Sequence, residues 1–273
     1  MRLRTLLVAA AAAAALVLAG GAGAIIGGSP DSAHPYVGLE TNGVFACSGT
    51  LISSQVLVTA AHCFADSSSA YGTAPDGAQR VKVTFAQQGP FDPAPTWVMG
   101  NYYFDPGFFT ASGKGMPGFD THDVAIIVLD RPVAMPTYGK LPPLGLAARL
   151  PNGAQVDVVG YGVQHFGKPD PCDPNCKKQP DAFFTRFAAP ANLITVRNRL
   201  GDEFIKISAN TSQEKGGVCF GDSGGPNFVG GTNVLLAETS FGNNPFCNGV
   251  AYNYRLDTAQ AQDWIAGAIA AHA

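Results

Sequence analysis

The sequence predicts an all-β protein of antiparallel strands that ends in one helix. Short runs rich in β-branched residues recur along the chain and are bounded by Gly, Pro, Asn or Asp. A clear helical pattern is confined to the C-terminal segment. Many short strands joined by Gly and Pro turns build a sandwich of two sheets or a pair of barrels, and 273 residues suffice for either.

Five segments carry the strand prediction. Residues 81–85 alternate between apolar and polar side chains, which is the period of a strand with one buried face. The other four are short β-branched runs: QVLVTAA at 55–61, DVAIIVL at 123–129, QVDVVGYG at 155–162 and NVLLAETSF at 233–241. Near the C-terminus, Asp257 or Thr258 can cap a helix in which Trp264, Ile265 and Ile269 share one face.

The first 24 residues have the pattern of a secretory signal. Arg2 and Arg4 precede an apolar run at 6–19, and small residues at 22–24 form an AxA cleavage site. The apolar run is shorter than the roughly 20 residues that a membrane-spanning helix needs. We therefore expect residues 1–24 to be removed and the mature protein to be secreted to the extracellular space, with no membrane association.

Charge and cysteine content narrow the class of protein. The net charge of −3 becomes more negative once the two arginines of the leader are removed, which argues against nucleic acid or an anionic membrane as the main partner. An even number of cysteines in an exported chain predicts three disulfides, for which about fifteen pairings are possible. The six cysteines are Cys47, Cys63, Cys172, Cys176, Cys219 and Cys247.

Two long insertions interrupt the strand pattern. Residues 87–122 are rich in Gly, Pro and aromatic residues, and residues 163–182 contain PDPCDPNCKKQPD. Loops of this length are usually functional or mobile. The aromatic side chains favour packing within their own loop over a substrate platform, so the sequence indicates no specific role for either insertion.

The segment 219–226, CFGDSGGP, places a lone hydroxyl among glycines directly after a carboxylate. Such a segment could be a tight turn between strands. It could also present a nucleophile, because Ser223 becomes reactive if a base takes its proton and an acid holds that base in one tautomer. His62 ends an apolar run beside Cys63, and Asp123 opens another, so these two are the candidate base and acid.

Together these motifs resemble the secreted chymotrypsin-fold serine peptidases of the trypsin-like family. Five motifs occur in the family's order: IIGG at 25–28, CSGTLIS at 47–53, TAAHC at 59–63, DVAIIVL at 123–129 and GDSGGP at 221–226. The resemblance runs from residue 25 to the terminal helix. It implies two packed antiparallel six-stranded β-barrels with a C-terminal α-helix, at 25–140 and 141–273, which together form one peptidase unit.

The resemblance also implies a role for each motif residue. Ser223 would be the nucleophile, His62 the general base and then the general acid, and Asp123 the group that orients the imidazole. The backbone amides of Gly221 and Ser223 would form the oxyanion hole, where glycine lets its amide face the developing charge without steric cost. The expected activity is that of a serine endopeptidase that hydrolyses peptide bonds through an acyl-enzyme.

Asp222 has a different role in this family, in which a new N-terminal ammonium inserts beside the carboxylate that precedes the nucleophile. Ile25 would supply that ammonium, because it follows the expected cleavage site directly. Position 24 carries neither Arg nor Lys. We therefore expect signal peptidase itself to create the activating terminus, with no separate zymogen segment.

The same alignment implies the disulfides. Cys47 would pair with Cys63 beside the histidine, and Cys219 with Cys247 beside the nucleophile, while Cys172 and Cys176 would pair within the second insertion. A CxxxC pair could instead bind metal, but two isolated cysteines lack the further ligands that zinc needs. No metal or other cofactor is expected.

Substrate preference follows from the residue six positions before the nucleophile, which lies at the bottom of the primary pocket in this family. An aspartate there selects Lys or Arg, but this chain has glycine, so an uncharged residue is expected before the scissile bond. The expected substrate-binding residues are Gly217, Val218, Ser240, Phe241, Gly242 and Gly249. The expected partners are polypeptide substrates and protein inhibitors, and the protein is expected to be a monomer.

Two alternatives stay open at this point. GDSGG also matches GxSxG, the nucleophile elbow of α/β-hydrolase esterases, but that fold requires the order Ser, Asp, His and alternating strands and helices. The second alternative is a catalytically silent relative that works as a secreted binding module. Reaction with a serine label such as a fluorophosphonate separates an enzyme from a binding module.

Overall fold

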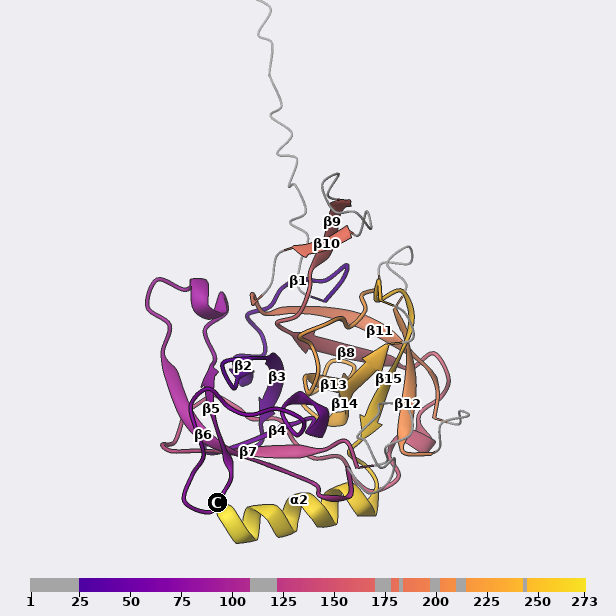
Figure 1. Ribbon diagram of the computed structural model, residues 1–273. Coiled ribbons are helices and arrows are strands. Elements are labelled where there is room, and N and C mark those ends of the chain that lie inside the picture. The colour runs from indigo at the N-terminus through magenta and orange to yellow at the C-terminus, as the bar shows by residue number, and fades with distance from the viewer. Residues whose placement is uncertain are drawn as a thin grey trace, which may run out of the picture.

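The computed structural model describes residues 25–108, 122–169, 178–181, 184–196, 202–209, 215–242 and 245–273. Across these residues the chain is mostly β-strand, and its one α-helix, α2 (Ala259–His272), lies at the C-terminal end. Figure 1 shows two barrels side by side with this helix beneath the first. This all-antiparallel arrangement confirms the predicted fold class and excludes an α/β-hydrolase.

The first barrel closes through six strands in the order β2-β3-β4-β7-β6-β5. Pairing of Leu39 with Thr84 joins β2 to β5 and completes the ring. The strands are β2 (Val37–Thr41), β3 (Ala46–Leu51), β4 (Val56–Thr59), β5 (Gln79–Thr84), β6 (Trp97–Phe104) and β7 (Ala125–Leu129).

The second barrel closes in the order β11-β12-β15-β14-β13-β8, and an additional β11–β8 pairing completes the ring. Its strands are β8 (Gln155–Gly160), β11 (Phe187–Thr195), β12 (Phe204–Ala209), β13 (Pro226–Val229), β14 (Leu235–Gly242) and β15 (Gly249–Arg255). Strand β1 (Ser29–Pro30) adds to β11 at one edge. A separate hairpin of β9 (His165–Pro169) and β10 (Lys178–Asp181) projects away from both barrels (Figure 1).

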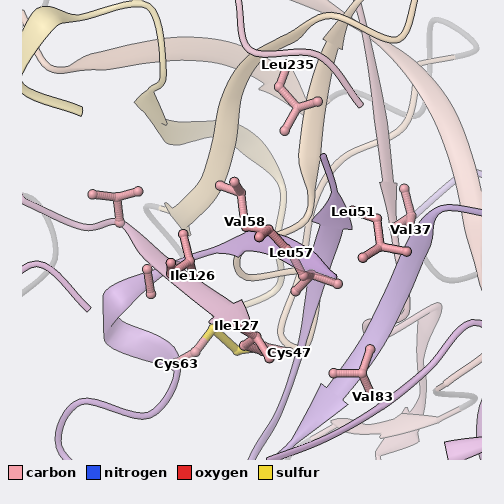
Figure 2. Close-up of a cluster of buried hydrophobic side chains, with 14 of the residues drawn as sticks. Val37, Cys47, Leu51, Leu57, Val58, Cys63, Val83, Ile126, Ile127 and Leu235 are labelled. Carbon is pink, nitrogen blue, oxygen red and sulfur yellow. A yellow bond between two sulfur atoms is a disulfide. The ribbon is translucent and has the colours of Figure 1, made fainter. Parts of the chain in front are cut away.

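The predicted apolar runs form the core strands. All four residues of β4 are buried, and Val58 pairs with Ile126 of β7. Figure 2 shows these side chains packed together with Leu235 of the second barrel, which belongs to the same buried cluster. Each such side chain contributes about 1.5–3 kcal/mol when fully buried, so one apolar core holds the two barrels together.

The C-terminal helix crosses back to the first barrel. Thr258 caps it by accepting a hydrogen bond from the Ala261 amide at 3.2 Å, while Asp257 accepts from the Ala147 amide at 2.7 Å. Ile265 is fully buried, and the helix contacts β7. Because it leaves the second barrel and packs on the first, the helix clamps the two together. No helix of the described residues is long and apolar enough to cross a membrane.

Candidate active site

His62 lies in a short 3-10 turn, η1 (Ala61–Cys63), which follows the buried strand β4. The disulfide between Cys63 and Cys47 of β3 braces this turn, with an S–S distance of 2.10 Å (Figure 2). The loop to the next strand therefore starts from a fixed backbone. The predicted strand run covers residues 55–61, but the strand itself ends at Thr59. The last residues of the run instead lead into the 3-10 turn.

Asp123 lies two residues before β7, the strand paired with β4, and its carboxylate lies beside His62. Its Oδ1 accepts a hydrogen bond from the His62 amide at 2.9 Å, and its Oδ2 lies 2.9 Å from His62 Nδ1. The Ser240 hydroxyl of β14 also donates to Oδ2. Asp123 is buried, so these three contacts hold the carboxylate in place and leave His62 Nε2 as the nitrogen that points away from it.

Each member of this pair shifts the pKa of the other. Burial alone lowers the pKa of His62, but the charge of Asp123 and its hydrogen bond outweigh burial and raise that pKa above 6.5. Burial raises the pKa of Asp123, but the His62 charge, its hydrogen bonds and the Ser240 hydroxyl together lower it. Asp123 is therefore ionised at neutral pH, and it stabilises the protonated form of His62.

Ser223 lies in the turn before β13, and its own carbonyl accepts a hydrogen bond from the Ser48 amide of β3 at 2.8 Å. The next residue, Gly224, has φ +74°, and a Cβ there would lie 2.1 Å from Thr59 Oγ1. Only glycine fits this left-handed position against the neighbouring strand. The turn that carries Ser223 is thus packed directly on the first barrel.

Two backbone amides beside Ser223 are available to a ligand. The amides of Gly221 and Ser223 donate to no other group of the described residues. Gly221 has φ +93°, and a Cβ at this position would lie 2.9 Å from the Gly162 Cα. Glycine therefore gives the backbone here a conformation that an L-residue rarely adopts.

His62 and Ser223 line the same two cavities, which also share Phe220. No hydrogen bond joins their side chains in the described part of the chain, and such bonds are often long in free enzymes. The first cavity has a volume of about 530 Å³ and the second about 370 Å³.

Four of the six expected substrate-binding residues line the first cavity. Its lining consists of His62, Val218, Cys219, Phe220, Ser223, Thr239, Ser240, Phe241, Gly242, Pro245 and Cys247. Gly217 and Gly249 are not among them, and Gly217 instead pairs with Ile26 through hydrogen bonds in both directions. None of the described residues that line this cavity is Asp, Glu, Lys or Arg, so this lining suits an uncharged group.

The second cavity is walled by two exposed aromatic rings. Phe45 and Phe220 are 56% and 58% exposed, and both line it beside the Cys47–Cys63 disulfide. Sequence reasoning did not single out either phenylalanine. Phe220 stands inside the CFGDSGGP motif, which could have indicated it, whereas the position of Phe45 depends on how the β2–β3 turn meets the second barrel.

Asp222 is fully buried beneath the nucleophile turn. Its Oδ1 accepts from the Gly162 amide and its Oδ2 from the Cys219 amide, each at 2.8 Å. Burial raises the pKa of Asp222 to about 7, although these two amides act to lower it. Ile25 is also fully buried, and its nitrogen is an amide while residues 1–24 remain attached.

The structure contains two of the three expected disulfides. Besides the one beside His62, Cys219 and Cys247 are joined with an S–S distance of 2.02 Å next to the first cavity. Cys172 and Cys176 lie outside the described residues. One group of described side chains is spaced like metal ligands, Glu40 with Cys47 and Cys63, but both sulfurs are used in their disulfide.

Comparisons with known proteins match most of the chain. The family model described as Trypsin matches residues 25–265. Trypsin delta of Drosophila melanogaster is 27% identical over 258 residues, covering 89% of this chain and 87% of that protein. Serine protease VLSP-3 of Macrovipera lebetinus is 26% identical and covers 90% and 87%. The structure of human heparin binding protein (HBP) has a TM-score of 0.64 at 19% identity, covering 90% of this chain and 97% of that one, which shows the common fold.

Proposed function

The chain belongs to the trypsin family of serine proteases, and on that premise we propose that it is a secreted endopeptidase that hydrolyses peptide bonds through an acyl-enzyme on Ser223. The observation that carries the proposal is the buried, hydrogen-bonded pair of His62 and Asp123, which opens onto the same cavities as Ser223.

The proposed reaction uses these groups in turn. The Ser223 oxygen attacks the scissile carbonyl while His62 Nε2 takes the hydroxyl proton, and His62 Nδ1–H keeps its hydrogen bond to Asp123. His62 then gives the proton to the leaving amine as the C–N bond breaks. A water molecule, deprotonated by the same nitrogen, attacks the ester and releases the acid and the free serine.

Charge stabilisation comes from fixed groups. The developing oxyanion would accept hydrogen bonds from the free amides of Gly221 and Ser223, and loss of one such donor typically costs about 3 kcal/mol of transition-state stabilisation. Asp123 stabilises the imidazolium that forms at the same moment. Backbone hydrogen bonds hold both the turn that carries these two amides and the Asp123 carboxylate, so these groups need little reorganisation during the reaction.

Substrate preference follows from the two cavities. The first lies along Ser240–Gly242 and would take the uncharged side chain before the scissile bond. The second lies on the opposite side of Ser223 and would take the residue after it, with Phe45 and Phe220 selecting an apolar side chain. The proposed substrates are thus polypeptides with apolar residues around the cleaved bond, and the same two cavities would accept protein inhibitors.

Activation would depend on Ile25. Cleavage after residue 24 would convert its buried amide into an ammonium, which we place beside the Asp222 carboxylate. The Ile26–Gly217 pairing already holds this segment against the second barrel. An ammonium there would keep Asp222 ionised in spite of its burial, and so fix the nucleophile turn. The leader and the two disulfides both fit export to an oxidising compartment, and we propose that the protein acts there as a monomer.

Labelling with a fluorophosphonate tests the proposed activity. We expect the secreted protein to be labelled and to cleave peptide bonds, and Ser223→Ala to lose both properties because the nucleophile is gone. Ser53→Ala, in a turn remote from both cavities, serves as the control and should label normally. A folded protein that is not labelled would contradict the proposal and favour a binding module.

The pH dependence tests the role of Asp123. Activity measured as kcat/KM should rise with pH as His62 loses its proton, with a midpoint above 6.5. Asp123→Asn removes the charge that raises this pKa, so burial should then lower it, and kcat should fall about 10⁴-fold, as is typical for this change in a Ser-His-Asp triad. NMR titration of the imidazole in a Ser223→Ala background measures the shift directly. An unmoved pKa would exclude the pairing.

N-terminal sequencing tests the activation step. Active protein from the medium should begin at Ile25, and Asp222→Asn should lose most of its activity, because removing one partner of a buried ion pair costs about 3–5 kcal/mol. An active enzyme that begins upstream of residue 25 would refute direct activation by signal peptidase.

Profiling on a peptide library tests the second cavity. Phe45→Ala should lower kcat/KM by about tenfold for substrates with an apolar residue after the scissile bond and leave other substrates little changed. Val44→Ala is the matched control, because Val44 is 60% exposed and does not line the cavity. Equal effects on all substrates would argue against a binding role for Phe45.

A further inference from the structure

Two buried carboxyl groups near the nucleophile have no part in the proposed reaction. Glu40 lies on β2 of the first barrel and Glu238 on β14 of the second, and both are fully buried. Among the described residues, neither pairs with a Lys, Arg or His. Within the described part of the chain, Glu40 Oε2 and both carboxyl oxygens of Glu238 have no partner within hydrogen-bond geometry.

Glu40 supports the strand that precedes His62. Its Oε1 lies 2.5 Å from Thr59 Oγ1, which also donates to the Ser48 carbonyl at 3.1 Å. Gly49 makes room for the carboxyl group, because a Cβ there would lie 2.9 Å from Oε2. The Glu40 carboxyl thus occupies a space that its neighbours leave for it.

Glu238 lies on the opposite side of the nucleophile turn. It is two residues before Ser240, which binds Asp123, and it pairs in the sheet with Pro226 of β13. The charge of Asp123 acts to raise the pKa of its carboxyl group, and the nearby Gly224 N–H acts to lower it.

Gly224 therefore lies between the two carboxyl groups. On one side it touches Thr59 Oγ1, the partner of Glu40, which would lie 2.1 Å from a Cβ at this position. On the other side its N–H donates to the Thr239 carbonyl of β14 at 2.8 Å, next to Glu238. We therefore expect a movement of Thr59 or of Thr239 to shift Gly224, the residue that follows Ser223.

Burial opposes ionisation of both glutamates and outweighs the hydrogen bonds that favour it, and at Glu238 the charge of Asp123 adds to the effect of burial. Burial raises the pKa of Glu40 and of Glu238 well above 4.5. The nearby Asp123 is ionised and compensated by His62, so a further negative charge meets repulsion without a free cation. The other titratable groups that face this cluster are Tyr102 of β6 and Tyr254 of β15, and neither supplies a positive charge.

From this placement we propose that Glu40 and Glu238 are positioning residues for the nucleophile. One uncharged carboxyl group from each barrel supports Gly224 and thereby the Ser223 turn, and ionisation of either group at alkaline pH displaces that turn. The kinetic part of this proposal rests on the proposed peptidase function. The structural part, that the two groups stay uncharged in the folded protein, does not.

Stability measurements in a Ser223→Ala background test the structural part without activity or self-cleavage. A group with a raised folded pKa makes the protein lose stability as pH rises above the unfolded pKa, about 4.3 for Glu. The folding equilibrium constant of Glu40→Gln or Glu238→Gln, relative to its parent, should therefore rise by up to tenfold per pH unit between pH 5 and 9. The exposed Asp202→Asn is the control and should show no such trend.

Kinetics test the positioning role. The parent enzyme should lose kcat on the alkaline side, and the Gln variant of the glutamate that ionises first should extend the active range to higher pH by about half a pH unit or more. The Ile25 ammonium also titrates there, but it is common to parent and variant, so the difference isolates the glutamates. Active-site titration with a fluorophosphonate at each pH reports the fraction of competent enzyme.

Three outcomes decide the proposal. A relative stability trend together with a shifted alkaline limb in either variant supports it, so failure of one variant to fold leaves the other informative. A flat relative stability from pH 5 to 9 overturns it, because the glutamates are then ionised in the folded state. If the stability trend is present but kcat falls at the same alkaline pH in parent and variants, only the positioning role is overturned. Absence of any labelling in the parent contradicts the peptidase function, while the stability result still decides the charge state.

Discussion

One serine of the first barrel, Ser48, ties the nucleophile turn across the barrel interface. Its amide donates to the Ser223 carbonyl at 2.8 Å and its hydroxyl to the Gly221 carbonyl at 2.9 Å, while the same hydroxyl accepts from the Tyr161 amide at 3.0 Å. His62 belongs to one barrel and Ser223 to the other, so their separation is set by this contact and by the shared apolar core. Because Ser48 uses backbone carbonyls, it fixes the turn without depending on which side chains the turn carries.

Close packing of the backbone makes this contact rigid. Gly162 lies against both Gly221 and the Asp222 carboxylate, and a Cβ at Gly162 would lie 2.6 Å from the Phe220 carbonyl. The orientation of the free amides is therefore held by neighbouring backbone, which cannot change rotamer. Closely packed protein interiors have low compressibility and transmit strain. A change at the barrel interface is consequently transmitted to the nucleophile turn as a displacement.

The fold class and the strands that carry the motifs could be predicted from the sequence, because β-branched runs and short motifs are local signals. The run at 123–129 predicts both β7 and the buried acid that precedes it, and the structure places that acid on His62. Long-range placement was not predictable in the same way. Glu40 follows an apolar residue in VGLET, so alternation alone favours an exposed side chain, but the side chain is buried against Thr59 and the disulfide. Gly217 was expected in the primary pocket, yet hydrogen bonds with Ile26 turn its backbone toward the N-terminal segment.

The buried acids of the site differ in what surrounds them, and this difference determines their charge. Asp123 has His62, two further hydrogen-bond donors and a lowered pKa, so it can remain charged in a region of low dielectric constant. Asp222 accepts from two backbone amides and pairs with no cation among the described residues, and burial raises its pKa to about 7. Glu238 has no hydrogen-bond partner for either oxygen among the described residues, and the charge of Asp123 adds to the penalty of burial. Among the described residues, the same cluster thus holds one acid that stays charged because it pairs with His62, and two glutamates whose ionisation is opposed by burial and that pair with no basic side chain.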